Sequence, residues 1–506
     1  IKIQDYLSSL VRAHDPSPET DATDVVKDVA LAWTAGRDAI THDVYFGTNA
    51  EDVAIADRSN PLNVLVSQDQ SETGFDPEGV LEYGQTYYWR VDEVNDATDS
   101  LVAGSVWSFT VEPFAYPITN VTATASASTP NMGPENTING SGLDDLDQHS
   151  TEATEMWMSG TVGPNWIQYE FDKAYKLHEL WVWNSNQMVE PFVGFGAKNV
   201  TIEYSVDDQT WSTLENVPEF ARATGSPAYA ANTTVDLAGI MAKYVKLTIN
   251  NNWGGAAPQT GLSEVRFFYT PTQAYQPDPA DDATDVSIDV QLDWRPGRDA
   301  TSHAVYFGAD ATAVAEGTAP SDTVAEHSYT PDSLIFATEY FWKVDETDDA
   351  GVDAGSVWSF TTEQFAPIDD FEGYNDDDNR IYQAWEDGVT NKASGSQVGY
   401  NESPFAERSI VHDGSQAMPL MYNNASSPYY SETERAFDTA QDWTAHGADS
   451  LCVYFHGIAG DTPNSSERLY LTVKDSSGKS KTVGSVDAAT VATSWQQWTI
   501  PLSEFT

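Results

Sequence analysis

Short segments in which apolar and polar residues alternate recur along the chain, whereas helical periodicity is nearly absent. Glycine, proline, asparagine and aspartate bound most of these segments, which is typical of half-buried strands joined by turns. The pattern therefore predicts an all-β fold. Representative segments are VALAW at 29–33, IQYEF at 167–171, NVTIEYSV at 199–206, YVKLTI at 244–249 and RLYLTVKD at 468–475.

Proline clusters divide the chain into parts of domain size. They lie at 16–18, 113–117, 271–279 and 363–367, and proline interrupts regular structure because it fixes φ and removes a backbone donor. We expect a chain of four β-sandwich domains behind a short leader, which is either a strand of its own or the end of an upstream domain. The expected bounds are 1–12 for the leader and 13–113, 114–270, 274–363 and 366–506 for the domains.

Part of the sequence occurs twice. GRDAITHDVYFG at 36–47 returns as GRDATSHAVYFG at 297–308, and AGSVWSFT at 103–110 returns unchanged at 354–361. The duplicated unit has roughly ninety residues, which is too long for a solenoid or propeller repeat. Duplicated modules usually provide spacing or avidity rather than chemistry.

Both repeats carry the same aromatic anchors. A tryptophan stands in an early strand, at Trp33 and Trp294, and a tyrosine opens a later strand, at Tyr87 and Tyr340. With these residues each repeat resembles a fibronectin type III-like sandwich, in which a tyrosine hydroxyl binds nearby backbone. The resemblance implies that the aromatic residues form a core and that the repeats are spacer domains.

The segment 114–270 contains an ordered series of motifs. They are ENTINGSGL at 135–143, EMWMS at 155–159, WIQYEFDKAYKLHELWVWN at 166–184, VTIEYSVDDQTWSTL at 200–214, AKYVKLTI at 242–249 and GLSEVRFF at 261–268. In order and spacing the series resembles the discoidin, or coagulation-factor C-type, domain, which is also the fold of many sugar-binding modules. The resemblance implies an eight-stranded jelly-roll sandwich with ligand loops at one end and with Trp157 in its core.

The last expected domain opens with IDDFEGY at 368–374 and reaches WQQWTIPLSEF at 495–505. It resembles the jelly-roll, carbohydrate-module-like domains of large bacterial secreted proteins, but it is one strand short, so we expect it to be incomplete at its C-terminus. Residues 1–6, IKIQDY, have a strand pattern. They either close an upstream domain or complete this last domain in another copy, which would build a head-to-tail filament.

The charge of the chain narrows the possible partners. Lys and Arg number 24 against 78 Asp and Glu, which gives a net charge of −54, so nucleic acids and anionic lipids would be repelled. No apolar run approaches the ~18 residues of a membrane span, and we expect no membrane insertion. The single cysteine, Cys452, excludes an internal disulfide and is expected to be a small core residue. We expect an extracellular or cell-surface location.

The motifs of common catalytic sites are absent. The sequence contains no HExxH, GxSxG or glycine-rich phosphate loop, and its nine histidines show no paired ligand spacing. A glycosidase would need two carboxylates that flank a sugar cleft, for which compact sandwiches leave no room. We therefore expect a protein that is not an enzyme.

Calcium is the expected cofactor, in a structural role, because it prefers oxygen ligands from carboxylates, amides and carbonyls. The discoidin resemblance implies a site between the loop at 139–141 and a glutamate near the last strand. Its expected ligands are Asn139, Gly140, Ser141, Thr154 and Glu264. Asn139 stands where the family has aspartate, which removes one negative charge. A second candidate consists of Asp369, Asp370 and Glu372, and solvated acidic loops are the alternative for both.

Sugar binding needs aromatic rings beside amides, because rings stack on sugar C–H faces and amides bond hydroxyl groups. The segments WVWNSNQ at 181–187, EPFVGFG at 190–196 and NNNWGG at 250–255 have this character. The alternative is that these loops only pack or contact another protein. We predict ligand contacts from Trp183, Asn184, Asn186, Phe195 and Trp253.

An acidic pair is common to both repeats, since Asp92-Glu93 returns as Asp345-Glu346. We expect each pair to enter a loop, where it could share an ion with a linker and stiffen a joint between domains. Plain surface charge is the simpler explanation.

Three hypotheses for function follow. The first is a non-catalytic secreted or cell-surface protein that binds glycans or other surface polymers through the domain at 114–270. The second is a structural subunit of an extracellular filament, surface layer or matrix. The third is the accessory region of a larger secreted hydrolase. Exposed Trp183 and Trp253 in an open cleft would favour the first, and burial of those loops between copies would favour the second.

Overall fold

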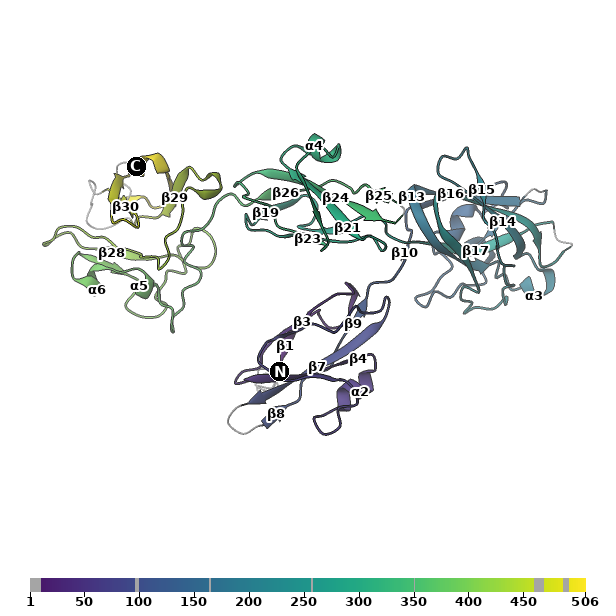
Figure 1. Ribbon diagram of the computed structural model, residues 1–506, viewed down its shortest axis with the longest axis horizontal. Coiled ribbons are helices and arrows are strands. Elements are labelled where there is room, and N and C mark those ends of the chain that lie inside the picture. Colours follow the sequence, from purple (N-terminus) through teal and green to yellow (C-terminus); the bar gives the residue numbers. More distant parts are fainter. Residues whose placement is uncertain are drawn as a thin grey trace. The chain divides into compact units, whose positions relative to one another are not determined.

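A computed structural model describes residues 11–95, 100–162, 165–255, 258–349, 351–458, 468–485 and 491–506 (Figure 1). Within these ranges the protein is nearly all β, as the alternating pattern predicts, and its longest helix, α2 (Ala50–Ile55), has six residues. No helix of the described ranges is long and apolar enough to cross a membrane. The strand expected at 1–6 lies outside these residues, so the head-to-tail hypothesis stays a prediction.

The chain divides into two compact units. The first contains residues 1–276, 294–303 and 345–355, and the second contains residues 277–293, 304–344 and 356–506. The division passes through the second repeat, whose segments 294–303 and 345–355 belong to the first unit.

The first repeat combines a three-stranded sheet, in the order β1-β3-β6, with a six-stranded sheet, in the order β2-β9-β7-β4-β5 with β8 on β7. Both sheets contribute to one core, which includes Leu31, Trp33, Trp89 and Phe109. The strands are β1 (His14–Ser17), β2 (Ala22–Val25), β3 (Leu31–Thr34), β4 (Thr41–Gly47), β5 (Leu65–Gln70), β6 (Gly74–Phe75), β7 (Thr86–Asn95), β8 (Ser100–Val102) and β9 (Trp107–Val111).

The second repeat has the same strand order. Its sheets run β18-β20-β23 and β19-β26-β24-β21-β22, with β25 on β24. Like the first repeat it carries one short helix, α4 (Ala311–Ala315). The strands are β18 (Tyr275–Asp278), β19 (Ala283–Val286), β20 (Leu292–Arg295), β21 (Ser302–Gly308), β22 (Ser321–Val324), β23 (Ser328–Tyr329), β24 (Glu339–Asp348), β25 (Gly351–Asp353) and β26 (Trp358–Thr362).

The tyrosine anchors of both repeats make the predicted contact with backbone. Glu82 N donates to the Tyr87 hydroxyl at 3.1 Å, and Ile335 N donates to the Tyr340 hydroxyl at 3.0 Å. Both tyrosines are buried, and a phenylalanine ring stacks on each at 5.1 Å between centroids. The expectation that these aromatic residues form a core is confirmed.

The acidic pair that the repeats share lies within strands rather than in loops. Asp92 and Glu93 belong to β7 and their counterparts to β24, and all four side chains are buried. Both explanations, an ion at a domain joint and plain surface charge, are wrong, because each pair is enclosed by its own repeat. Asp92, for example, accepts two hydrogen bonds from Arg90 at 2.7 and 2.9 Å.

The middle domain contains one connected sheet of eight strands, in the order β10-β17-β13-β16-β14-β15 with β11 on β13 and β12 on β17. The two longest strands pair with register shifts that bend them, and the sheet encloses a core with Trp157 fully buried, as predicted. The strands are β10 (Tyr116–Pro117), β11 (Val121–Ala125), β12 (Trp157–Met158), β13 (Asn165–Asn184), β14 (Ala197–Ser205), β15 (Ser212–Thr213), β16 (Thr233–Asn252) and β17 (Gly261–Tyr269).

The described part of 366–506 forms three two-stranded sheets, so the jelly roll expected there stays a prediction. Cys452 is exposed on β29 and its Sγ accepts a hydrogen bond from Gln497 Nε2, which corrects its expected place in a core. The elements are α5 (Ile381–Ala384), α6 (Gly388–Asn391), β27 (Ser396–Val398), β28 (Leu420–Tyr422), η3 (Ala445–Gly447), β29 (Ser450–Phe455), β30 (Tyr470–Lys474), β31 (Ser480–Gly484), β32 (Gln496–Pro501) and η5 (Leu502–Phe505).

Candidate functional site

Glu264 is a buried carboxylate beside the loop at 139–141. It lies on β17, and its Oε1 accepts a hydrogen bond from Gly140 N at 3.3 Å, whereas its Oε2 has no partner among the described residues. Gly140 has a φ of 65°, which glycine adopts at low cost. Burial raises the pKa of Glu264 to about 8. A buried oxygen without a partner fits a cation ligand.

Two of the other predicted calcium ligands have hydrogen-bond partners of their own. Asn139 Oδ1 accepts a hydrogen bond from Ser141 N at 2.9 Å and so closes the turn. Thr154 lies in η2 (Ala153–Glu155), and its carbonyl accepts from Asn136 Nδ2 at 2.9 Å, which ties it to η1 (Pro134–Thr137) just before the loop. The described residues contain no group of three or more His, Cys, Asp or Glu that could hold a metal ion. A cation here would depend mainly on neutral oxygens.

The second predicted calcium set is not brought together. Asp369 Oδ2 accepts a hydrogen bond from Trp385 Nε1 at 2.7 Å, and Asp370 Oδ1 accepts from Glu372 N at 3.0 Å. The carboxylate of Glu372 accepts from the Ser415 hydroxyl and from Ser415 N, and the bond to the hydroxyl is the main cause that holds the pKa of Glu372 below its usual range. These carboxylates bond to the protein itself, and the described residues contain no group of three or more that could hold a metal ion here.

Three of the predicted sugar contacts are buried. Trp183 is 1% exposed, and Asn184 and Asn186 are fully buried. Asn184 Nδ2 donates to Ala197 O at 2.7 Å, and Asn186 Oδ1 accepts from Gly225 N at 2.9 Å. The expectation that these side chains face a ligand is corrected, because their polar atoms hold the loops of the domain together.

Phe195 and Trp253 are half-buried, so their predicted ligand contacts stay predictions. Trp253 Nε1 donates to Phe220 O at 3.0 Å, and Lys198 Nζ lies 4.5 Å from the centre of the Trp253 ring. One edge and one face of this ring are therefore occupied by the protein itself.

The sequence analysis missed Phe192, whose side chain is 88% exposed. Phe192 lies in α3 (Glu190–Val193), which a buried carboxylate organises: Glu190 accepts hydrogen bonds from Phe195 N at 2.8 Å and Gly196 N at 3.0 Å. Burial raises the pKa of Glu190. The segment EPFVGFG was the available signal, but its pattern did not tell which of its two phenylalanines faces solvent.

Two glycine turns pack closely against the α3 segment. A Cβ added to Gly225 would lie 2.5 Å from Pro191 Cδ, and a Cβ added to Gly254 would lie 1.9 Å from Val193 O. Residues with a side chain do not permit such close approach. The glycines therefore hold both turns in place beside α3.

An exposed surface results at this end of the domain. The Thr224 and Ser226 hydroxyls, one on either side of Gly225, are exposed and lie 2.9 Å apart. Met188, just before α3, is exposed as well. We call Met188, Phe192, Thr224 and Ser226 the loop surface. It combines an aromatic ring and an apolar chain with two hydroxyls.

Residues 121–264 match the F5/8 type C domain. The matched F5/8 type C range includes the loop surface, the loop at 139–141 and Glu264. The chain matches no curated protein.

Several solved structures are similar to about a third of the chain. The family 32 CBM of Clostridium perfringens NanJ, in complex with galactose, is 15% identical over 31% of this chain and 98% of that chain, with a TM-score of 0.23. A Streptococcus pneumoniae fucose binding module is 14% identical over 31% of this chain and 96% of that chain, with a TM-score of 0.22. A family 89 glycoside hydrolase from Clostridium perfringens is 15% identical over 30% of this chain, with a TM-score of 0.22, and the match spans 14% of its length.

Proposed function

We propose that this chain is a non-catalytic secreted or cell-surface protein that binds glycans through the loop surface of its F5/8 type C domain. The observation that carries the proposal is Phe192, a ring 88% exposed to solvent on a segment fixed by the buried Glu190. The repeats before and after this domain act as fibronectin type III-like spacers.

The chemistry of the loop surface suits a neutral sugar. An exposed phenylalanine ring offers a flat apolar face to sugar C–H groups, and the Thr224 and Ser226 hydroxyls can bond sugar hydroxyls. Since α3 and the turn at 224–226 are held in place, little conformational entropy is lost on binding. The net charge of −54 disfavours acidic glycans.

Titration of the full chain with galactose and with fucose, followed by calorimetry, tests this function. These sugars come first because two of the similar structures are named for them. Phe192→Ala should weaken binding by more than about tenfold, since exposed aromatic anchors often contribute 2 kcal/mol or more. The control is Phe365→Ala, which removes a phenylalanine that is 68% exposed outside this domain. Equal binding by both variants would contradict the proposal.

Calcium is proposed as a structural cofactor of the same domain. Glu264, Asn139, Thr154 and the carbonyls of Gly140 and Ser141 would hold it. This proposal is supported by the buried Glu264 Oε2, which has no hydrogen-bond partner among the residues that the structure describes. The ion would supply the positive charge that a buried carboxylate lacks, and it would hold the loop at 139–141 against β17.

A pH series with and without chelator tests the calcium proposal. Without calcium, Glu264 has a folded pKa of about 8, raised above its unfolded value. Its contribution to the free energy of unfolding is therefore fully present below the unfolded pKa and is lost as the pH rises toward 8. Calcium should remove this loss and raise stability by about 2.7 kcal/mol at a hundredfold excess over Kd.

Glu264→Gln supplies the matched control, because it keeps the shape of the side chain and removes the titrating group. The variant should show neither the decline of the melting temperature with pH nor its rise with calcium. A wild-type melting temperature that calcium does not change at pH 8 would refute the calcium proposal and leave the glycan proposal untouched.

A further inference from the structure

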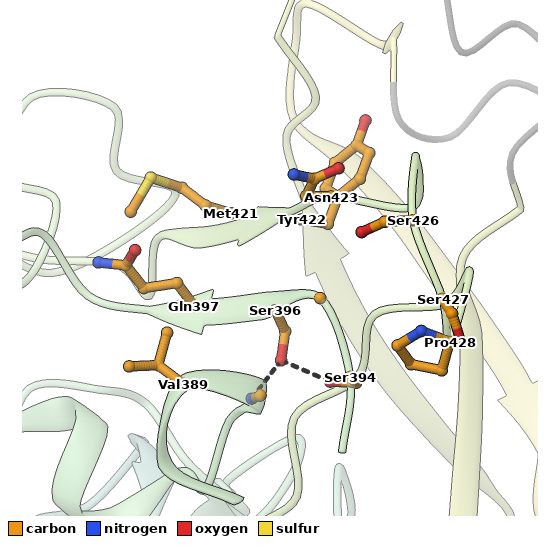
Figure 2. A pocket seen from close by; sticks show the side chains of 12 residues that line it. Val389, Ser394, Ser396, Gln397, Met421, Tyr422, Asn423, Ser426, Ser427 and Pro428 are labelled. Carbon is orange, nitrogen blue, oxygen red and sulfur yellow. Dashed lines mark hydrogen bonds between the residues drawn. The ribbon is translucent and has the colours of Figure 1, made fainter. Parts of the chain in front are cut away.

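The C-terminal region of the second unit contains a cavity of about 330 Å³. Figure 2 shows residues that line it, which come from α6, from β27 and the two residues before it, from β28 and the residue after it, and from the loop at 426–428. The volume lies at the lower end of the range for small-ligand sites, about 300–1,000 Å³. No lining residue is charged, although charged residues make up 20% of the chain.

The floor of the cavity is fixed by close backbone packing. A Cβ added to Gly388 would lie 2.1 Å from Ser394 O, and a Cβ added to Gly395 would lie 2.1 Å from Asn423 O. Ser396 Oγ accepts a hydrogen bond from Gly388 N at 2.8 Å, as Figure 2 shows. Close backbone packing therefore fixes this part of the lining.

The rim offers one hydrogen-bond acceptor and one donor. Gln397 Nε2 donates to Asn401 Oδ1 at 2.8 Å, and Asn423 Oδ1 accepts from a backbone N–H at 3.1 Å. Within the described residues, no hydrogen bond uses Gln397 Oε1 or Asn423 Nδ2. Met421 and Tyr422 add apolar surface and are 39% and 40% exposed.

We propose that this cavity is a second binding site, which takes one unit of a neutral sugar. Neighbouring sugar hydroxyls can donate to Gln397 Oε1 and accept from Asn423 Nδ2, because each hydroxyl can do both. Met421, which pairs with Gln397 across β27 and β28, contacts the C–H face. Anionic ligands are disfavoured, since the lining contains no cation and the chain is strongly acidic. The site does not depend on glycan binding by the F5/8 type C domain.

Methyl NMR of the full chain tests this site directly, with the Met421 methyl group as a local probe. The chain has seven methionines, so Met421→Leu assigns the signal. Galactose, glucose and xylose are the neutral probes, and glucuronate is the anionic one. At least one neutral sugar should shift the Met421 signal to saturation, and glucuronate should not. The shift should persist in Phe192→Ala, which separates this site from the loop surface.

Two variants of the rim complete the test. Gln397→Ala and Asn423→Ala should each weaken the affinity for the responding neutral sugar by about tenfold. This corresponds to the loss of one hydrogen bond of about 1–1.5 kcal/mol. Gln496→Ala, which removes an exposed amide from β32, should leave it unchanged. The proposal is overturned if no neutral sugar gives a saturable shift, if glucuronate shifts the signal equally, or if Phe192→Ala abolishes the response.

Discussion

In both repeats a histidine and a glutamate meet inside the sandwich: His42 with Glu93 in the first, and His303 with Glu346 in the second. All four side chains are buried, and a tryptophan ring lies edge-on to each imidazole, at 5.5 and 5.6 Å between ring centroids. The duplicated sequence has kept a polar pair together with its aromatic neighbour. The surroundings of the pair differ, however, since Glu93 Oε1 also accepts from Gly36 N at 2.7 Å, whereas Glu346 Oε1 is buried and has no partner in the part of the chain that the structure describes.

A second difference concerns the short helix of each repeat. In the first repeat the Arg90 guanidinium donates to the carbonyls of Val53, Ala54 and Ala56 at the end of α2. In the second repeat Lys343 takes this position, and its Nζ lies 4.7 Å from the centre of the Tyr306 ring. The Arg90 guanidinium likewise lies over the equivalent ring, 4.2 Å from the centre of Tyr45. The difference is one of cation type, since a single ammonium cannot reproduce the planar fork of a guanidinium.

The third difference lies in the shared GRDA segment. Arg298 is buried and donates to Glu112 Oε2 and Pro113 O, each at 2.9 Å, within the first unit. Its counterpart Arg37 is 61% exposed and lies 3.8 Å from Asp38. The same residue at equivalent positions of the two repeats therefore makes different contacts. The comparison teaches that duplication preserved the contacts of the core, while each copy acquired its own polar contacts around it.

The largest expected effect comes from removing the buried histidines. His303→Ala should destabilise its repeat by about 3–5 kcal/mol, because it leaves a buried carboxylate unpaired. His42→Ala should cost less, since Glu93 keeps its bond to Gly36. Hydrogen exchange of β7 and β24 resolves the two repeats, with His14→Ala as a surface control. Equal losses in both repeats would show that the Gly36 contact does not compensate.

A smaller effect is expected at the GRDA arginines. Arg298→Ala should cost about 1–3 kcal/mol, because Glu112 retains the Tyr275 hydroxyl at 2.9 Å. Arg37→Ala should change stability by no more than about 0.5 kcal/mol, as is usual for exposed positions. The measurement is hydrogen exchange at 107–117. If Arg37→Ala costs as much as Arg298→Ala, the arginine acts within its own turn and the difference in burial is irrelevant.

The smallest effect is expected from exchanging the cations beneath the helices. Arg90→Lys should lower the stability of α2 by about 1 kcal/mol, since at least one carbonyl loses its donor. Lys343→Arg is the reciprocal change and should leave the exchange of α4 nearly unaltered. Faster exchange confined to 50–56 in Arg90→Lys would support the distinction, whereas an equal response of both helices would remove it.

Much of the fold was predictable because the alternation of apolar and polar residues indicates a strand from neighbouring residues alone. The strands, the duplication, the tyrosine contacts at Tyr87 and Tyr340 and the burial of Trp157 all followed from the sequence. In the segment WVWNSNQ at 181–187, alternation indicated only which residues share a face of the strand. It did not tell which face other loops would cover, and for that reason Asn184 and Asn186 were misplaced.

Long-range partners explain the other differences. Asp92 and Glu93 resemble surface residues until β4 brings His42 beside them from 51 positions away. Phe192 became a site residue only when buried Glu190 and the Gly225 turn fixed its surroundings. Cys452 lies in an alternating strand, but on its exposed face. In each case a contact between distant segments, rather than the residue's own neighbours in sequence, decides the outcome.

Asn186 has a consequence for how two ligands would influence each other. Its Nδ2 donates to Ser150 O at 3.0 Å and to Ser226 O at 2.9 Å, and Ser150 N donates to Gly142 O at 2.8 Å. One buried amide thus joins the segment that follows the predicted calcium loop to the turn of the loop surface. Because the turn is already held in place, coupling would act through this shared amide: the proposed ion would fix the segment at 142–150, and the amide would carry that restraint to the turn that the proposed sugar contacts. By thermodynamic reciprocity the sugar would tighten the ion by the same factor, so each affinity would be a function of the other ligand's concentration.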